Sequence, residues 1–477
     1  MMKILVLNGS PSGDSSITLQ TVLYIEQYFA DHPAKPEFEI LHVGQRIRQY
    51  EKDFSSCRDS LENADLILFC YPVYTFLVPS QLHRFIELIR EHGVELRGKY
   101  ATQLTTSKHF YDTTAHRFIE DVCADFGMKY VKGLSADMDD LLAEKGRREA
   151  VSFFRFVLHA MKKGWHEPMK NPGVPEGVGL KTAAAGAGYP AAGAGRGAGG
   201  AANEDSRFVI ITDLPVSSSG AAGEETSDAS AERLKAMINS FTSVSPAACE
   251  VVNLREYPFA GGCLGCFRCA ADGTCVYKDG FDEFLRNHIQ TADAIVYAYT
   301  IKDHSMGSRF KMFDDRQFCN GHRTVTMGKP VGYLVDGHLR YEENLKTLMT
   351  ARAEVGGNFL AGIATDEDDH DREISQLAGT LTYAVSRNFQ MPATFYGVGG
   401  MKIFRDLIWQ MQGLMREDHR FYKEHGFYDF PQKRRARMLG MYLVGSMMQN
   451  PVLRKKMGGK MTEGMLMPYK AALKKKK

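Results

Sequence analysis

The fold is decided near the N-terminus, by the stretch Lys3-Ile4-Leu5-Val6-Leu7-Asn8-Gly9-Ser10-Pro11-Ser12-Gly13-Asp14-Ser15-Ser16-Ile17-Thr18. Its aliphatic half predicts a buried strand, and the apolar positions Leu19, Val22, Leu23 and Phe29 predict a following helix. A Gly/Ser/Thr turn between them forms an anion site, because the first N–H groups of a helix lack intrahelical partners and carry positive potential. No Lys or Arg lies in the turn, so it suits a monophosphate better than a triphosphate. An ordinary turn with a serine cap is the alternative.

Two motifs point to a known family. Gly9-Ser10-Pro11 followed by Ser16-Ile17-Thr18 resembles the loop that holds the FMN phosphate in the flavodoxin-like NAD(P)H-dependent FMN reductases and quinone reductases. Tyr71-Pro72-Val73-Tyr74 and the segment 79–86 are similar to that family's stretch beside the isoalloxazine ring, although His83 and Glu87 stand where the family usually has Lys and Asp. The resemblance implies FMN as the cofactor and NAD(P)H as the co-substrate. The binding residues that it implies are Ser10, Pro11, Ser16, Ile17, Thr18, Pro72, Val73, Tyr74, Phe76, Thr106 and Ser107.

Length and composition limit the class of protein. With 477 residues the chain is too long for one ordinary domain, so two or three domains are expected. No run of eighteen apolar residues is present, and the apolar stretch after Met1 is too short for a signal peptide, so we expect a cytoplasmic protein. Without a signal, the nine cysteines indicate thiols or metal ligands rather than a disulfide framework.

The first 165 residues are predicted to alternate between strands and helices, which is typical of a parallel sheet with right-handed crossovers. The predicted strands are 3–7, 37–43, 65–70, 99–105 and 129–133, and the predicted helices are 16–30, 51–62, 79–91, 112–126 and 141–163. Ligands of such sheets bind at the carboxyl ends of the strands. The loops 8–16, 71–78 and 106–112 are therefore expected to converge on one site.

A second series of the same kind begins at Arg207-Phe208-Val209-Ile210-Ile211-Thr212. Landmarks recur at a nearly constant offset: Ser80-x-x-His83-x-Phe85-x-Glu87 matches Ser308-x-x-Lys311-x-Phe313-x-Asp315, 228 residues later. Such matches predict two copies of one fold. The second copy has Asp213-Leu214-Pro215-Val216 in place of the phosphate loop, and the acidic residues Glu224, Glu225 and Asp228 follow, so this copy is expected to repel a phosphate.

The predicted architecture is α/β, with two flavodoxin-like, doubly wound, parallel five-stranded sheets in tandem and a helical C-terminal extension. The predicted domains are a flavodoxin-like FMN-binding domain at 1–165, an Ala/Gly-rich flexible linker at 166–204, a second flavodoxin-like domain at 205–390 and a basic helical extension at 391–477.

A cysteine motif follows the second predicted strand of the second copy. Cys263, Cys266, Cys269 and Cys275 have the spacing C-x2-C-x2-C-x5-C. Four thiolates are what a [4Fe–4S] cluster requires, whereas zinc sites with four cysteines usually come as two separated CxxC pairs. The motif resembles that of the iron–sulfur flavoproteins, in which the cluster of one subunit is expected near the flavin of another. A cysteine-lined loop beside the flavin or at a dimer contact, and a zinc site, remain open alternatives.

The C-terminal region is strongly basic. Between Lys433 and Lys477 thirteen Lys and Arg residues oppose one acidic residue, so this segment carries +12 and the remainder −10, which gives the net charge of +2. A helical extension with a solvated tail is the favoured interpretation, and weak contact of the tail with an anionic membrane surface is the alternative. No groove-reading motif accompanies the charge, so nucleic acid is not expected as a partner. A homodimer is also left open.

These features predict an NAD(P)H-dependent oxidoreductase that passes electrons through FMN to a quinone, another small acceptor or an iron–sulfur centre. The alternative is an iron–sulfur flavoprotein that acts as an electron carrier or redox sensor without nicotinamide turnover. A degenerate scaffold without cofactor is disfavoured by the intact loop from Gly9 to Thr18. No general acid or base is assigned, because His109, Tyr111 and His116 are interpreted as packing or surface residues.

Overall fold

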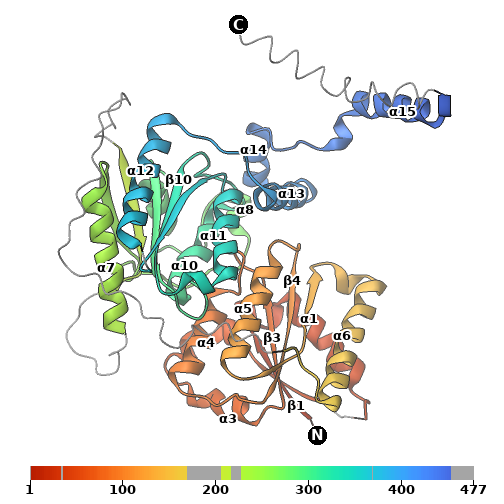
Figure 1. The fold of residues 1–477 in the computed structure, drawn as a ribbon. Helices are drawn as coiled ribbons and strands as arrows, with labels where there is room; N and C mark the ends of the chain where they lie inside the picture. The colour runs from red at the N-terminus through yellow and green to blue at the C-terminus, as the bar shows by residue number, and fades with distance from the viewer. Residues whose placement is uncertain (1, 34–35, 169–205, 216–226, 368, 453–477) are drawn as a thin grey trace. The chain divides into compact units, whose positions relative to one another are not determined.

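The computed structural model describes residues 2–33, 36–168, 206–215, 227–367 and 369–452 (Figure 1). The chain divides into two compact units, Met1–His419 and Arg420–Lys477. The first unit contains both predicted α/β domains. Most of the predicted linker, residues 169–204, lies outside the described residues.

The first domain is built on a parallel sheet in the order β2-β1-β3-β4-β5, with β6 paired to β4. This is the doubly wound order 2-1-3-4-5 of flavodoxin-like folds. Its strands are β1 (Met2–Asn8), β2 (Pro36–Leu41), β3 (Leu66–Pro72), β4 (Tyr100–Ser107), β5 (Lys129–Tyr130) and β6 (Leu134–Asp137). Its helices are α1 (Ile17–Phe29), α2 (Val43–Tyr50), α3 (Ser55–Asn63), α4 (Ser80–Glu91), α5 (Asp112–Asp125) and α6 (Glu144–Lys163).

Two details of this domain differ from the sequence-based expectation. The last strand, expected at 129–133, is split into β5 and β6, which pair in turn with the two halves of β4. The split falls at Gly133, where a Cβ would lie 2.4 Å from the Gln103 side chain. Helix α2 was also not expected, because its sequence is short and rich in Arg and Gln, although Val43, Ile47 and Tyr50 recur at helical spacing.

The second domain repeats the fold, with the parallel order β11-β10-β9-β7-β8. Its strands are β7 (Arg207–Thr212), β8 (Ala248–Asn253), β9 (Ala294–Thr300), β10 (Pro330–Asp336) and β11 (Phe359–Thr365). Its helices are α7 (Ser227–Val244), α8 (Arg268–Asp272), α9 (Phe281–Phe284), α10 (Gly307–Arg316), α11 (Glu343–Val355) and α12 (His370–Arg387). Strands β3 and β9 lie 228 residues apart at both ends, so the predicted tandem copies are confirmed.

The repeat extends to an unusual turn. After β3, Thr75 and Phe76 both have positive φ (41° and 71°), and after β9 the corresponding Asp303 and His304 do too (49° and 58°). Each turn is closed by two backbone hydrogen bonds, between Tyr74 and Leu77 in the first copy and between Lys302 and Ser305 in the second. Consecutive left-handed residues are typical of a type I′ turn and strain side chains other than glycine. Both copies therefore have a strained backbone conformation at the same position of the fold.

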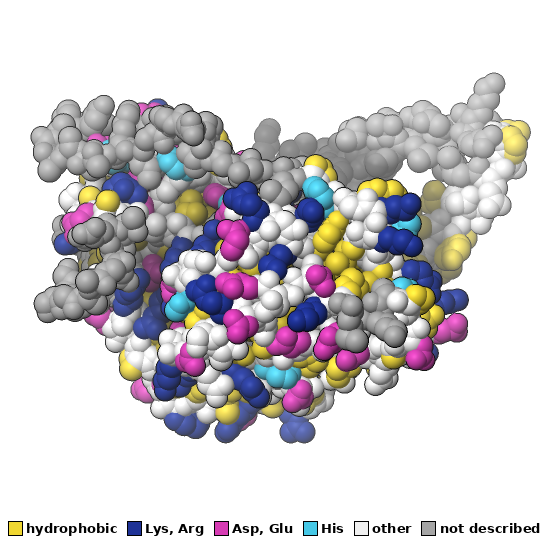
Figure 2. Space-filling model, turned by 90° about the horizontal axis from the view of Figure 1, so that it is seen from below, with side chains coloured by type: hydrophobic (Ala, Val, Ile, Leu, Met, Phe, Trp, Pro, Cys, Tyr) yellow, Lys and Arg dark blue, Asp and Glu magenta, His cyan; other side chains and the backbone are white. Residues whose placement is uncertain are grey.

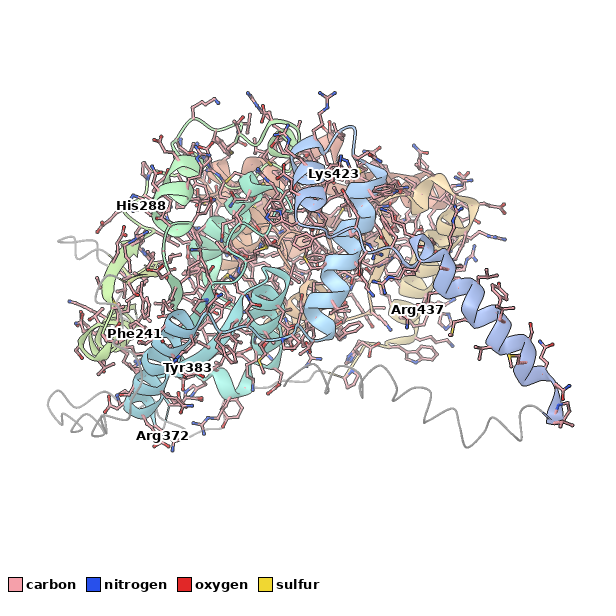
Figure 3. All side chains as sticks on the ribbon, turned by 90° about the horizontal axis from the view of Figure 1, so that it is seen from above. Phe241, His288, Arg372, Tyr383, Lys423 and Arg437 are labelled. Atoms are coloured by element: carbon pink, nitrogen blue, oxygen red, sulfur yellow. The ribbon has the colours of Figure 1, made fainter. Side chains whose placement is uncertain are left out.

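Each sheet is covered by helices on both faces (Figure 1). In the second domain α7 and α12 cover one face, where Phe241 of α7 is buried; Figure 3 marks these helices with Phe241, Arg372 and Tyr383. In the first domain α1 and α6 bury their apolar residues together in the same way. The opposite faces share one core: a single cluster of buried apolar residues includes Phe85 of α4 and Phe313 of α10.

Helices α4 and α10 join the two domains through reciprocal caps. Glu87 of α4 accepts hydrogen bonds from the Ser308 amide (2.8 Å) and hydroxyl (2.6 Å) at the start of α10. Asp315 of α10 accepts one from the Ser80 amide (2.8 Å) at the start of α4. Carboxylates are favourable at helix N-termini, where amides are unpaired and the potential is positive. Since these residues correspond at the 228-residue offset, the interface resembles an isologous dimer contact within one chain.

The remaining helices follow β11 and α12. Helix α13 (Phe395–Gln410) contacts α11 within the first unit, α14 (Arg416–Glu424) spans the boundary between the units, and α15 (Arg435–Gln449) exposes Met438, Leu439 and Tyr442. Among the described residues, no helix has both the length and the apolar character needed to cross a bilayer. On the face shown in Figure 2, Lys and Arg side chains lie among Asp and Glu side chains rather than in a block. Contacts of the basic tail with a membrane stay a prediction.

Candidate functional site

A cavity of about 530 Å³ lies at the carboxyl ends of the first sheet, within the range of small-molecule sites. The three predicted loops converge there. Ten of the eleven predicted binding residues line it: Ser10, Ser16, Ile17, Thr18, Pro72, Val73, Tyr74, Phe76, Thr106 and Ser107. The eleventh, Pro11, is buried but does not line the cavity.

The turn between β1 and α1 has the geometry of an anion site. The Ser16 hydroxyl caps α1 by accepting a hydrogen bond from the Leu19 amide (3.3 Å). Asn8 fixes the turn, since its amide group donates to the Gly13 carbonyl (3.0 Å) and accepts from the Ser10 amide (3.2 Å). No described residue accepts a hydrogen bond from the amides of Ile17 and Thr18. These two donors at the positive end of α1 suit a phosphate.

Close packing holds this turn in place. The Thr18 and Thr106 hydroxyls lie 2.6 Å apart, which ties the start of α1 to the end of β4. A Cβ on Gly44, at the start of α2, would lie 2.3 Å from the Gly9 carbonyl oxygen. Only glycine therefore allows α2 to approach the turn so closely. The unexpected helix α2 is thus part of the wall behind the anion site.

The strained turn after β3 supplies an aromatic side of the cavity. Phe76 packs against Phe110 and Tyr111, with ring centroids 5.1 and 4.6 Å away, and Phe110 stacks on Phe404 of α13 at 4.1 Å. Tyr74 and Phe110 also line the cavity. An apolar, aromatic side next to a polar anion site fits a planar ring attached to a phosphate.

The cysteine loop of the second domain faces the same cavity. Cys263, Cys266, Cys269 and Cys275 all line it. The loop touches the first domain directly, because the Gln81 side chain donates to the Cys263 carbonyl (3.1 Å) and a Cβ on Gly265 would lie 1.9 Å from the Tyr74 hydroxyl oxygen. Two motifs separated by some 250 residues of sequence are therefore neighbours in the fold.

The four thiols form a donor set that could bind a metal. Among the described residues, no three of these sulfurs lie mutually within 4.8 Å, whereas tetrahedral zinc holds thiolate sulfurs about 3.8 Å apart. Burial raises the pKa of Cys269 to about 12, and burial also raises that of Cys263. These groups are thiols unless a metal charge stabilises their thiolates. A cluster with four cysteine ligands matches this donor set in kind.

Sequence reasoning missed several lining residues that only the tertiary structure brings together. The Arg316 guanidinium is 1% exposed, donates twice to Asp279 (2.8 Å each) and lies 3.9 Å from the Cys275 sulfur. Cys319 also lines the cavity, as does Leu407 of α13. In the sequence, only Asp279 pointed to this arginine. A carboxylate that becomes buried in the fold needs a charged or hydrogen-bonding partner, and here that partner is Arg316.

The three residues to which no catalytic role was assigned have structural partners. Among the described lining residues, none is His109, Tyr111 or His116. The His109 ring is bonded to Asp112 (2.8 Å), the Tyr111 hydroxyl donates to the Tyr396 carbonyl (2.5 Å), and the His116 ring lies 2.8 Å from the Thr105 hydroxyl. These contacts agree with packing roles.

In the second domain, the carboxyl ends of two neighbouring strands carry buried ion pairs. At the ends of β10 and β11, Arg233 of α7 donates to Asp336 (2.7 Å) and Asp366 (3.0 Å), and both carboxylates are buried. Asp336 and Asp366 correspond to Ser107 and Asp137 of the first domain at an offset of 229. Burial and the neighbouring Asp336 carboxyl raise the pKa of Asp366 to about 7. The loop expected to repel a phosphate in the second copy falls largely in residues 216–226, which lie outside the described residues together with Glu224 and Glu225, so that expectation stays a prediction.

Comparison with known proteins identifies the first domain. The model of the family described as NADPH-dependent FMN reductase matches residues 2–136. The match to this family therefore covers most of the first domain. The family predicted from the motifs is thereby confirmed, and with it the prediction of an oxidoreductase class. The two sheets agree with the predicted tandem copies.

Individual relatives were found for about a third of the chain. An iron–sulfur flavoprotein of Archaeoglobus fulgidus is 28% identical over 176 residues, which are 35% of this chain and 79% of the relative. Among solved structures, the flavoenzyme NAD(P)H:(acceptor) oxidoreductase FerB of Paracoccus denitrificans is 19% identical and covers 34% of this chain and 98% of its own, with a TM-score of 0.28. General stress protein 14 of Treponema denticola in complex with FMN is 14% identical and covers 34% and 99%, with a TM-score of 0.26.

Proposed function

We propose that the chain is an NAD(P)H-dependent FMN oxidoreductase whose flavin binds in the cavity of the first domain. The observation that carries the proposal is the convergence of ten predicted binding residues on one cavity, with the N-terminus of α1 at its polar side. The family match covers the same domain. We therefore assign the cofactor site to the first copy alone.

Different residues of the cavity would bind the phosphate and the ring of the cofactor. The amides of Ile17 and Thr18, with the hydroxyls of Ser10 and Ser12, would hold the phosphate without a basic side chain. The turn at Tyr74 to Phe76 would hold the ring, and the strained backbone keeps that surface fixed before the cofactor arrives. FMN, when bound, accepts hydride from a reduced nicotinamide and releases electrons to an acceptor. The acceptor would be a quinone, another small molecule or an iron–sulfur centre.

The cysteine loop is proposed as the ligand set of a [4Fe–4S] cluster beside the flavin. Four thiols line the flavin cavity from the other domain, and one relative is named an iron–sulfur flavoprotein. Arg316, fixed by Asp279 next to Cys275, would offset part of the negative charge of four thiolates. One chain would thus hold both redox centres, with the flavin bound by the first copy of the fold and the cluster bound by the second.

A second candidate function follows from the same loop. A flavin and a cluster that share one cavity also suit an electron carrier or redox sensor that receives its electrons from a protein rather than from a nicotinamide. Steady-state oxidation of NADH or NADPH by the reconstituted chain distinguishes the two. Turnover supports the reductase, and the absence of turnover with both nucleotides supports the carrier.

The experiment that tests the proposal is anaerobic purification, followed by a visible spectrum and by quantification of FMN, iron and sulfide in one sample. We expect one FMN and about four irons per chain. Cys266→Ser should lose the iron and keep the flavin, whereas the matched control Cys249→Ser, outside the cavity, should keep both. Flavin without iron in the parent chain would leave a plain FMN reductase. A chain that binds no FMN after reconstitution would refute the flavin site.

A further inference from the structure

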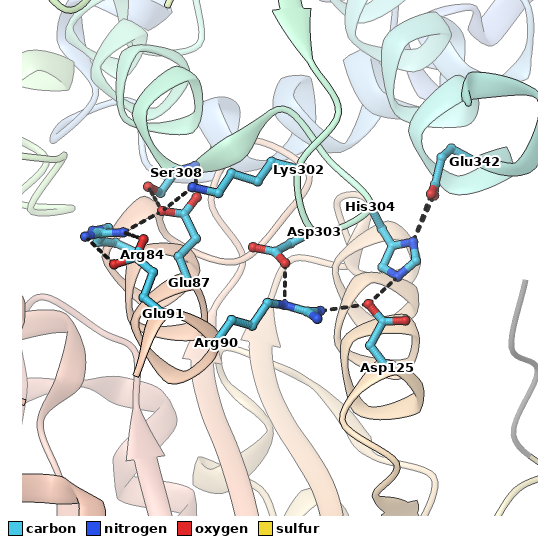
Figure 4. Close-up of polar contacts among 10 residues, drawn as sticks. All are labelled: Arg84, Glu87, Arg90, Glu91, Asp125, Lys302, Asp303, His304, Ser308 and Glu342. Atoms are coloured by element: carbon cyan, nitrogen blue, oxygen red, sulfur yellow. Dashed lines mark hydrogen bonds and ion pairs between the residues drawn. The ribbon is translucent and has the colours of Figure 1, made fainter. Parts of the chain in front are cut away.

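A second cluster of metal-ligating side chains lies at the interface of α4 and α10. His83, Glu87 and Asp303 each offer a ligand atom, and these atoms all lie within 4.8 Å of one another. The side chains are buried, with exposed fractions of 0% for His83, 3% for Glu87 and 5% for Asp303. Glu87 and Asp303 come from different domains, as Figure 4 shows.

The histidine of this cluster lacks the contacts that a packing histidine needs. Among the described residues, neither Nδ1 nor Nε2 of His83 has a hydrogen-bond partner, and the same is true of Oδ2 of Asp303. Buried polar atoms are nearly always paired, because leaving water without a new bond costs free energy. An imidazole nitrogen without a hydrogen-bond partner can offer its lone pair to a metal ion.

The equivalent position in the second half of the interface contains a buried cation, the Lys311 ammonium. At the 228-residue offset, His83 and Glu87 correspond to Lys311 and Asp315. The fully buried Lys311 ammonium is bonded to Asp315 and donates to the Tyr74 carbonyl (2.9 Å). A cation is therefore part of the second half, and the first half has an imidazole ring close to two carboxylates at the equivalent position.

We propose that His83, Glu87 and Asp303 bind a divalent transition-metal ion, of which zinc is the best match. One imidazole and two carboxylates are ligands that zinc accepts, and a three-residue set leaves a fourth position for water. The ion would take the place that the Lys311 ammonium has in the other half. Because its ligands come from both domains, it would hold them together.

The surrounding cations are compatible with an added ion because other carboxylates already balance them. Arg84 contacts Glu87 (3.0 Å) and also Glu51 and Glu91. Arg90 contacts Asp303 (2.5 Å) and also Asp125, as Figure 4 shows. Lys302 lies 3.7 Å from Glu87 with its side chain 55% exposed, so its ammonium can move into water. Lys311 is neutralised by Asp315.

The test uses the full chain with Cys266→Ser and Cys269→Ser, so that the cysteine loop does not take up the probe. Zinc is added, the sample is dialysed, and metal content and thermal unfolding are measured with and without EDTA. We expect one zinc per chain and, at zinc about 100-fold above Kd, a rise in Tm of about 3 °C. His83→Lys, which copies the residue of the second half, should abolish zinc binding while keeping the Tm of the EDTA-treated parent.

Two further variants keep the outcome clear if His83→Lys does not fold. Asp303→Asn should weaken zinc binding at least 10-fold and still fold, because asparagine tolerates the positive φ of 49° at this position. His92→Lys, an exposed histidine just after the same helix, should bind zinc as the parent does. Failure of the double-serine parent to bind zinc, or zinc binding that survives both His83→Lys and Asp303→Asn, would overturn the proposal.

Discussion

The two α/β domains share strand order, helix placement and a strained turn, but they differ at the carboxyl ends of their sheets. The first domain keeps a cavity there, with free amides at the start of α1. The second domain carries buried ion pairs of Arg233 with Asp336 and Asp366 at the carboxyl ends of β10 and β11. The described residues therefore form a cavity at this end of the first sheet and buried ion pairs at this end of the second.

This difference shows that the fold can be kept while the side chains at the ends of the strands change. The sheet is specified by apolar strands and by crossover geometry, which both copies keep. The site depends on a few side chains after the strands, which the second copy has replaced. The second copy has in turn supplied the cysteine loop, which reaches over the cavity of the first. Residues of both domains therefore line this cavity.

The largest effect should come from breaking one of the two reciprocal caps between α4 and α10. Asp315→Asn would leave the fully buried Lys311 ammonium without its carboxylate, so we expect a loss of about 3–5 kcal/mol of unfolding free energy. Glu87→Gln should cost less, because Arg84 retains Glu51 and Glu91. Urea unfolding in EDTA measures both, and equal losses would contradict the asymmetry.

An intermediate effect should follow from adding charge at the start of α1. Aspartate is as good a helix cap as serine, so Ser16→Asp should keep the fold while placing a carboxylate where the phosphate is proposed to bind. We expect FMN affinity to fall about 100-fold, which corresponds to about 2.7 kcal/mol. Flavin fluorescence titration measures it.

The control for this variant is Ser16→Asn, which also caps helices well but carries no charge. It should bind FMN within a few fold of the parent. If Ser16→Asp binds FMN as well as Ser16→Asn does, the phosphate does not lie at this turn.

The smallest effect concerns pH and the ion pairs of the second domain. Because the raised pKa of Asp366, about 7, exceeds the usual value near 4, the folded state binds this proton more tightly than the unfolded chain does. Its contribution to stability is complete below about pH 4 and is lost as the pH rises through 7. We expect a loss of at most about 2 kcal/mol between pH 5 and 7.

Asp366→Asn should flatten this pH dependence, since asparagine still accepts the hydrogen bond from the Gly337 amide (2.9 Å) without titrating. Urea unfolding at a series of pH values compares the two chains. The same slope in both would show that Asp366 titrates near its ordinary pKa. Asp137→Asn, the equivalent change in the first domain, should leave the slope of unfolding free energy against pH unchanged.

Much of the fold could be predicted because local sequence patterns specify its strands and helices. The strands β1, β3, β4, β7 and β9 are short apolar runs between turn residues, and they appear where the sequence predicts them. Helix α2 and the split of β5 from β6 were not predicted. They depend on contacts of Gly44 with the turn at Gly9 and of Gly133 with Gln103, which are distant in sequence.

The sequence by itself determined the family of the first domain, the repeat and the residues that converge on one cavity, because strand and helix periodicity and the turn at Gly9 to Thr18 act over short distances. Only the tertiary structure decided which motifs become neighbours. The packing of α4 against α10 brings the cysteine loop to the cavity, buries Arg316 beside Cys275 and gathers His83, Glu87 and Asp303. Arg316 and Cys275 lie 41 positions apart, but the other contacts join residues more than 200 positions apart, and their geometry depends on how two complete domains fit together.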